Sequence, residues 1–125
     1  MHKPPKRIVA AVDDLFFTVK ITDAAKRAGL AVDFVKTEKE LLEQAASKPA
    51  LIILDLNFSA VQPLKSVGKL KGSAESKQVS VIGYLSQAQG ELKQKAHEAG
   101  CDMVLARSAF SQNLPQILKR HAEAP

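Results

Sequence analysis

Five short apolar runs, each followed by a segment with helical spacing, constrain the fold of this chain more than any other feature. The runs cover residues 7–12, 31–35, 51–54, 79–85 and 103–105. The helical segments cover 16–28, a stretch that begins at Thr37, 64–70, 91–99 and 114–122. Short continuous apolar runs are typical of strands buried on both faces. Strands that alternate with helices over short connections form a parallel sheet with right-handed crossovers.

Local signals mark the ends of several predicted helices. Thr37 and Glu40 form a capping box. Gly29 follows its helix at the position where a left-handed residue is favoured. Asn113 is the predicted cap of the last helix, with Pro115 in its first turn. The predicted fold is an α/β domain, namely a doubly wound, five-stranded parallel sheet of flavodoxin-like type with helices on both faces.

Length and cysteine content bound the domain organisation. The chain has 125 residues, the usual size of one domain, so we assign residues 7–125 to a single domain and residues 1–6 to a basic leader. No apolar run approaches the roughly 20 residues that cross a bilayer, so we expect no membrane segment. Cys101 is the only cysteine, which excludes an intramolecular disulfide and favours a cytoplasmic location.

The formal charge of +5 does not predict a nucleic-acid partner. Lysine and arginine residues are spread along the chain, without interleaved aromatic residues on which bases could stack. His2, His97 and His121 are scattered, and we expect them to face solvent. Cys101 is predicted to be a packed thiol, whereas Tyr84 fits either the core or the surface that faces a helix.

Polar side chains follow four of the five predicted strands. They are Asp13 and Asp14 after the first strand, Asp55 after the third, Ser86 after the fourth and Arg107 after the fifth. Acids in such loops often only cap helix amides. Ligands of parallel sheets, however, bind at the carboxyl ends of the strands. Three converging carboxylates repel one another and are neutralised by a hard divalent cation, for which Mg²⁺ is the first candidate. With a hydroxyl and a fixed cation, this set is what phosphoryl transfer needs.

Over nearly its whole length the sequence resembles the receiver domains of bacterial response regulators. The resemblance is carried by Val12-Asp13-Asp14, Leu54-Asp55-Leu56-Asn57, Leu85-Ser86, and Ala99-Gly100-Cys101-Asp102 leading to Arg107. It implies a stand-alone receiver in two-component phosphorelay signalling, a signalling module and not an enzyme. Its phosphoryl donor would be a histidine kinase or a phosphotransfer protein, and a downstream protein partner would read the signal.

The same resemblance assigns roles to the polar residues. Asp55 would accept the phosphoryl group, and Ser86 would contact the phosphoryl oxygens. Asp13, Asp14, Asp55 and the backbone carbonyl of Asn57 would hold Mg²⁺. Arg107 stands where the family has a lysine and would supply the fixed positive charge.

Several positions depart from the family pattern. Arg107 presents a planar guanidinium in place of a compact ammonium. Ser108 replaces a proline, Val104 replaces the switch aromatic, and Phe58-Ser59 changes the loop after the acceptor. These changes leave open an alternative, a pseudo-receiver that binds its partner without phosphorylation. A phosphatase is less favoured because Asn57 stands where a second aspartate would act.

A flavin carrier is also less favoured. Its phosphate would meet Asp13 and Asp14 where amides and hydroxyls are needed. In the favoured interpretation, we expect Arg107 to pair with Asp55 across the pocket. The helix over 91–99, the fifth strand and the final helix are expected to form the partner-facing surface, with exposed apolar side chains.

Overall fold

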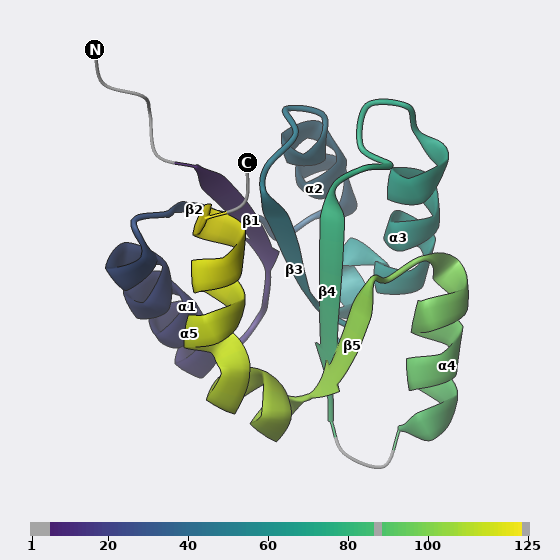
Figure 1. Cartoon of the computed structure of the whole chain (residues 1–125). Coiled ribbons are helices and arrows are strands. Elements are labelled where there is room, and N and C mark those ends of the chain that lie inside the picture. Colours follow the sequence, from purple (N-terminus) through teal and green to yellow (C-terminus); the bar gives the residue numbers. More distant parts are fainter. Residues whose placement is uncertain (1–5, 87–88, 124–125) are drawn as a thin grey trace.

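The computed structural model describes residues 6–86 and 89–123, and within them strands and helices alternate from end to end (Figure 1). The strands are β1 (Arg7–Ala11), β2 (Ala31–Phe34), β3 (Leu51–Asp55), β4 (Ser80–Leu85) and β5 (Met103–Ala106). The helices are α1 (Leu15–Ala28), α2 (Glu38–Ala45), the short 3₁₀ turn η1 (Ser59–Val61), α3 (Pro63–Gly72), α4 (Gly90–Ala99) and α5 (Arg107–Glu123).

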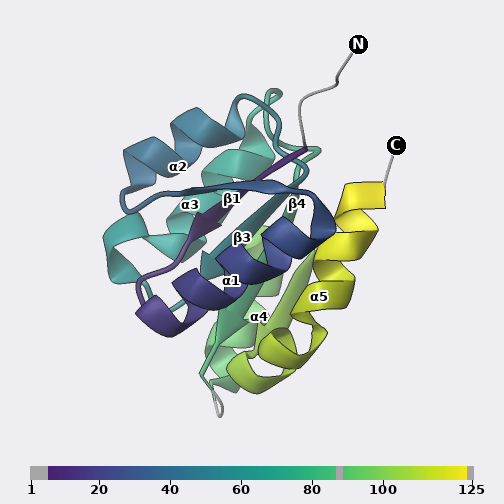
Figure 2. The same cartoon turned by 90° about the vertical axis from the view of Figure 1, so that its left-hand side faces the viewer.

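The five strands form one parallel sheet in the order β2-β1-β3-β4-β5, which confirms the predicted fold class. Helices α1 and α5 lie side by side on one face, and α2, α3 and α4 cover the other (Figures 1 and 2). Each face of the sheet has its own apolar core. Successive residues of a strand point to opposite faces, so every central strand contributes to both cores.

The predicted helix signals operate as expected at α1 and α2. The Asp14 side chain caps α1, and Gly29 ends it in the left-handed conformation with φ 75°. Thr37 caps α2 through the Glu40 amide, and the Glu40 carboxylate bonds back to the Lys36 amide and the Thr37 hydroxyl. Each of these residues satisfies a terminal backbone group that would otherwise have no intrahelical partner.

The predicted start of the last helix is wrong. Helix α5 begins at Arg107, directly after β5, and Asn113 lies inside it, where its side-chain amide donates to the Ala109 carbonyl. Pro115 therefore sits in the helix interior. The buried stripe begins at Phe110, four residues before Leu114, and this apolar contact with the sheet extends the helix past the local cap signal.

The structure also bears on the expectations for the cysteine, the tyrosine and two of the histidines. Cys101 is a buried free thiol, and burial raises the pKa of this thiol to about 11. Tyr84 belongs to the core, and His97 is exposed while His121 is partly buried. None of the described helices combines the length and apolarity that a bilayer crossing needs. His2 and the predicted leader, apart from Lys6, lie outside the described residues.

Candidate functional site

The carboxyl ends of the central strands bring four of the sequence-predicted residues to one edge of the sheet. Asp55 is the last residue of β3, Asp14 precedes α1, and Arg107 is the first residue of α5. Ser86 follows β4. Because α1 and α5 pack against each other on the same face, Asp14 and Arg107 meet although 93 positions separate them.

Asp55 is the buried acid of the site, with only 6% of its surface exposed. Its Oδ1 accepts a hydrogen bond of 2.9 Å from the backbone N–H of Asn57. Burial raises the pKa of this carboxyl, and the negative charges of Asp14 and Asp13 add to the effect. The Asn57 N–H and the positive charge of Arg107 oppose it. The side chain is thus weakly solvated and partly oriented.

The pKa of Asp14 is shifted in the opposite direction to that of Asp55. Its Oδ1 accepts from the Phe17 amide at 2.7 Å, and its Oδ2 accepts from Nη2 of Arg107 at 2.7 Å. Burial by itself would raise the pKa of Asp14, but these two bonds outweigh it and lower the pKa. Both oxygens are therefore already engaged, one as the cap of α1 and one in an ion pair.

The expectation that Arg107 pairs with Asp55 is wrong, because its partner is Asp14. The guanidinium lies over the ring of Phe17, with Cζ 4.8 Å from the ring centroid. The packing of α1 against α5 brings the cap of α1 to the first residue of α5. The Arg107 side chain also keeps a large exposed fraction there, 42%, which avoids burying a charge next to Asp55.

Asn57 and Ser86 join the ends of β3 and β4. The amide of Ser86 donates to Oδ1 of Asn57 at 3.2 Å and to Oε1 of Gln89 at 3.1 Å. The Ser86 hydroxyl is exposed and is 3.5 Å from the same Asn57 oxygen. Sequence reasoning assigned Asn57 only a backbone carbonyl, and it overlooked Gln89. The sequence signal that could have revealed this link is an amide side chain shortly after each of two neighbouring strands.

The described residues do not form a ready metal site. Among them, no group of three or more acidic, histidine or cysteine side chains is arranged to hold a metal ion. The oxygens of Asp13, Asp14, Asp55 and the Asn57 carbonyl have the right chemistry for Mg²⁺. In this arrangement, however, Arg107 and the α1 amide occupy Asp14, while Asp13 is exposed. The Arg107 guanidinium thus already bonds one of the carboxylates that would hold the cation.

Tyr84, which the sequence left undecided between the core and a helix-facing surface, lies in the core beside Asp55. It pairs with Asp55 in the β3–β4 register, and it is completely buried. Burial and the nearby charges of Asp55 and Asp14 raise the pKa of its hydroxyl. The available signal was its position, two residues before Ser86 in a buried strand.

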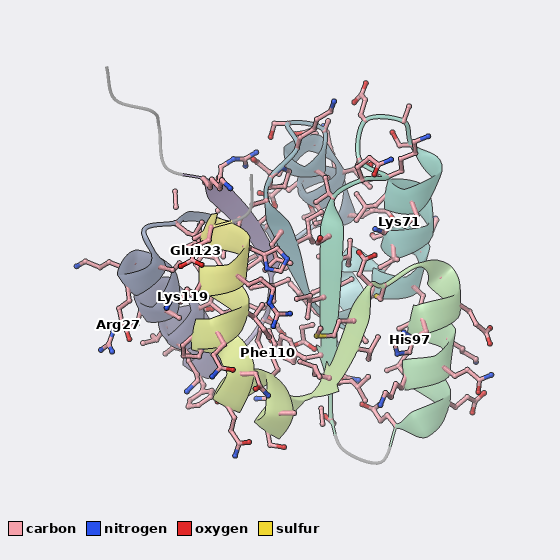
Figure 3. The ribbon with its side chains drawn as sticks, viewed as in Figure 1. Arg27, Lys71, His97, Phe110, Lys119 and Glu123 are labelled. Carbon is pink, nitrogen blue, oxygen red and sulfur yellow. The ribbon has the colours of Figure 1, made fainter. Side chains whose placement is uncertain are left out.

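One cavity lies away from these acids. It measures about 530 Å³ and lies between α1 and α5. Its lining includes Arg27, Lys119 and Glu123, which come from those two helices (Figure 3). The cavity contains none of the strand-end residues, so it is not part of this site.

Comparison with known proteins identifies the fold. No protein-family profile matches the sequence, and no curated protein matches it. A response regulator from Hahella chejuensis superposes with a TM-score of 0.84 at 16% identity, over 95% of this chain and 96% of that one. The chemotaxis response regulator CheY4 of Vibrio cholerae gives 0.79 at 19% identity, over 94% and 98%.

A third structure was solved with a magnesium ion coordinated in its active-site cleft. It is the receiver domain of a sensor histidine kinase from Pseudomonas aeruginosa, with a TM-score of 0.80 at 16% identity over 96% of this chain and 99% of that one. These similarities show that the chain has the fold of response-regulator receiver domains. The likeness is one of fold, at 16–19% sequence identity.

Proposed function

We propose that this protein is a response-regulator receiver domain that accepts a phosphoryl group on Asp55 in two-component signalling. The observation that carries the proposal is the placement of Asp55 at the carboxyl end of the central strand β3, buried, oriented by Asn57 and close to the charge of Arg107. The receiver fold supports it. The role of the protein would be to carry a signal. A cytoplasmic location agrees with its single cysteine, whose thiol is buried.

Phosphoryl transfer to Asp55 needs no proton transfer when the donor is an acyl phosphate. One carboxylate oxygen forms a bond to phosphorus, while the bond from phosphorus to the donor oxygen breaks. The donor departs as a carboxylate with the bonding electron pair. Arg107 offsets the charge that accumulates at the strand ends, and the Ser86 hydroxyl is placed to bond a phosphoryl oxygen.

A divalent cation would compete with Arg107 for the Asp14 carboxylate. Mg²⁺ would gain the oxygens of Asp13 and Asp55 at once, but Asp14 would first have to release the guanidinium. We therefore expect weaker cation binding than an acidic pocket without this ion pair would show.

Among the described residues, most exposed large apolar side chains lie on α1 and not on the predicted partner-facing surface of α4, β5 and α5. Among large apolar side chains, the strongly exposed ones are Leu15, Phe16 and Val19 of α1, at 77%, 61% and 60%. On α4, β5 and α5, Met103 is the large apolar side chain that stands out as exposed. Leu15 directly follows Asp14, so we propose that the histidine kinase or phosphotransfer protein contacts this end of α1. The downstream partner would contact another surface.

One observation favours the alternative of a phosphorylation-independent interaction module. Both oxygens of Asp14 are satisfied within the chain, so the site is closed without a metal or a phosphoryl group. A pseudo-receiver would keep this arrangement permanently.

Incubation with acetyl phosphate and Mg²⁺, followed by intact mass and peptide mapping, distinguishes a phosphorylated receiver from a pseudo-receiver. The proposal predicts one added phosphoryl group on Asp55 and none in Asp55→Asn. Asp23→Asn, which changes an exposed acid of α1, is the matched control and should be labelled like wild type. Labelling at another residue, or no labelling of the folded wild type, would favour the pseudo-receiver.

A further inference from the structure

The ring of Tyr84 is held rigidly beneath the acceptor site. It stacks on Phe110 of α5, with centroids 4.8 Å apart and planes at 10°, and it lies 4.6 Å from the ring of Phe17 of α1. Figure 3 shows Phe110 on α5, next to the sheet. Tyr84 has no exposed surface. A ring packed on both sides cannot swing out to bring its hydroxyl to water.

That hydroxyl makes no hydrogen bond of normal geometry among the described residues, although Asp55 lies near enough to raise its pKa as a hydrogen-bonding neighbour. Buried polar groups are nearly always bonded, and an unbonded hydroxyl loses its water without compensation. A phenol hydroxyl carries its proton at neutral pH and can donate. The group therefore needs an acceptor within the reach of a small side-chain adjustment.

Asp55 is the acceptor that the fold supplies. Leu51 and Ile53 point to the α1/α5 side of the sheet, so strand alternation places Asp55 on that side as well. Tyr84 is its register partner and points to the same side. Among the charged groups that shift the pKa of the Tyr84 hydroxyl, Asp55 has the largest effect, followed by Asp14 and Arg107. The second oxygen of Asp55, Oδ2, has no donor among the described residues.

We propose that Tyr84 is a positioning residue whose hydroxyl donates a hydrogen bond to the Asp55 side chain from the core side of the sheet. With Asn57 N–H on Oδ1, this bond would fix the plane of the carboxyl group. Its part in phosphoryl transfer rests on the function proposed above, but the bond itself does not.

Phosphorylation changes this bond. The Asp55 oxygen that attacks phosphorus becomes the bridging oxygen, and the other becomes a neutral carbonyl, which accepts more weakly than a carboxylate. Tyr84 touches Phe17 and Phe110, so the change reaches α1 and α5 directly.

The composition of the chain makes a direct test possible. Tyr84 is the only tyrosine and there is no tryptophan, so the tyrosine Raman doublet of the whole protein reports on this one hydroxyl. Wild type should show the signature of a strong donor. Asp55→Ala should lose it, and Asp13→Ala, which removes a nearby charge without removing the acceptor, should keep it. Should Asp55→Ala fail to fold by circular dichroism, Asp55→Asn takes its place and should show a weaker donor.

A second measurement tests the positioning role. Tyr84→Phe keeps the ring stack and removes only the donor, and acetyl phosphate should label it about tenfold more slowly than wild type at equal folding. A wild-type doublet of an unbonded hydroxyl, or one unchanged by loss of the Asp55 carboxyl, overturns the hydrogen bond. Equal labelling rates overturn the positioning role. A wild type that is not labelled at all overturns the proposed function instead, and the Raman result still decides the bond.

Discussion

Two aspartates of the same site should affect stability in opposite directions. We expect Asp55→Asn to stabilise the protein at neutral pH and Asp14→Asn to destabilise it. The reason is that burial raises the pKa of Asp55, whereas hydrogen bonding and Arg107 lower that of Asp14 against the effect of burial. The native state thus disfavours the charged form of one side chain and favours that of the other.

The size of each change in the free energy of unfolding depends on which hydrogen bonds the asparagine retains. At position 55 an asparagine oxygen can still accept from the Asn57 amide, and removal of the buried charge should outweigh a weaker bond from Tyr84, so we expect a net gain of about 1 kcal/mol. At position 14 asparagine is as good a helix cap as aspartate, so the loss is limited to the Arg107 pair. With 42% and 32% of these side chains exposed, that pair is screened and contributes roughly 0.5 kcal/mol.

The two effects should disappear in different pH ranges. The Asp55 carboxyl is protonated in the native state as pH falls through its raised pKa, so the advantage of Asp55→Asn fades between that pKa and the ordinary value of 3.8. The Asp14 contribution is complete above 3.8 and is lost only as pH falls through the lowered native pKa below it. On acidification the Asp55→Asn gain therefore vanishes first.

Urea unfolding followed by circular dichroism, at a series of pH values, measures both effects. Asp23→Asn serves as an exposed control and should change the free energy of unfolding by no more than about 0.5 kcal/mol. The reasoning fails if Asp55→Asn is less stable than wild type at neutral pH, or if its advantage does not shrink on acidification.

Three further predictions follow. In Arg107→Lys the directed Nη2 hydrogen bond to Asp14 is lost, so Mg²⁺ should raise the melting temperature more than in wild type, and equal shifts would contradict competition for Asp14. Phe16→Ser should slow phosphoryl transfer from a cognate donor protein but leave acetyl phosphate labelling and stability nearly unchanged, since Phe16 is 61% exposed. Gly83→Ala should destabilise the fold by about 1–3 kcal/mol in urea unfolding, because its Cβ would lie 2.9 Å from Leu56 Cδ1, and a neutral effect would refute that clash.

Much of the fold could be predicted from the sequence because its signals are local. Apolar runs such as Leu51 to Leu54 identify a buried strand, and the Thr37 and Glu40 pair identifies a helix start. Parallel topology follows from the alternation of elements. These signals depend on neighbours a few residues away, and no competing tertiary contact overrides them.

The start of α5 shows where local signals fail. Asn113 and Pro115 indicated a helix beginning near residue 113, yet α5 starts at Arg107. The contact of Phe110 with Tyr84 and Phe17 extends the helix, and that contact joins three elements distant in sequence. A local cap preference of about 1 kcal/mol is small compared with the burial of a phenylalanine side chain.

The sequence by itself determined which polar residues reach the edge of the sheet, because each lies at the end of a strand or shortly after it. It did not determine how they pair. Asp14 and Asp55 are both acids after buried strands, but the packing of α1 on α5 gives Arg107 to Asp14 and leaves Asp55 buried above Tyr84. Pairing between side chains depends on the distances between elements, and these are set only when the two apolar cores of the sheet are packed.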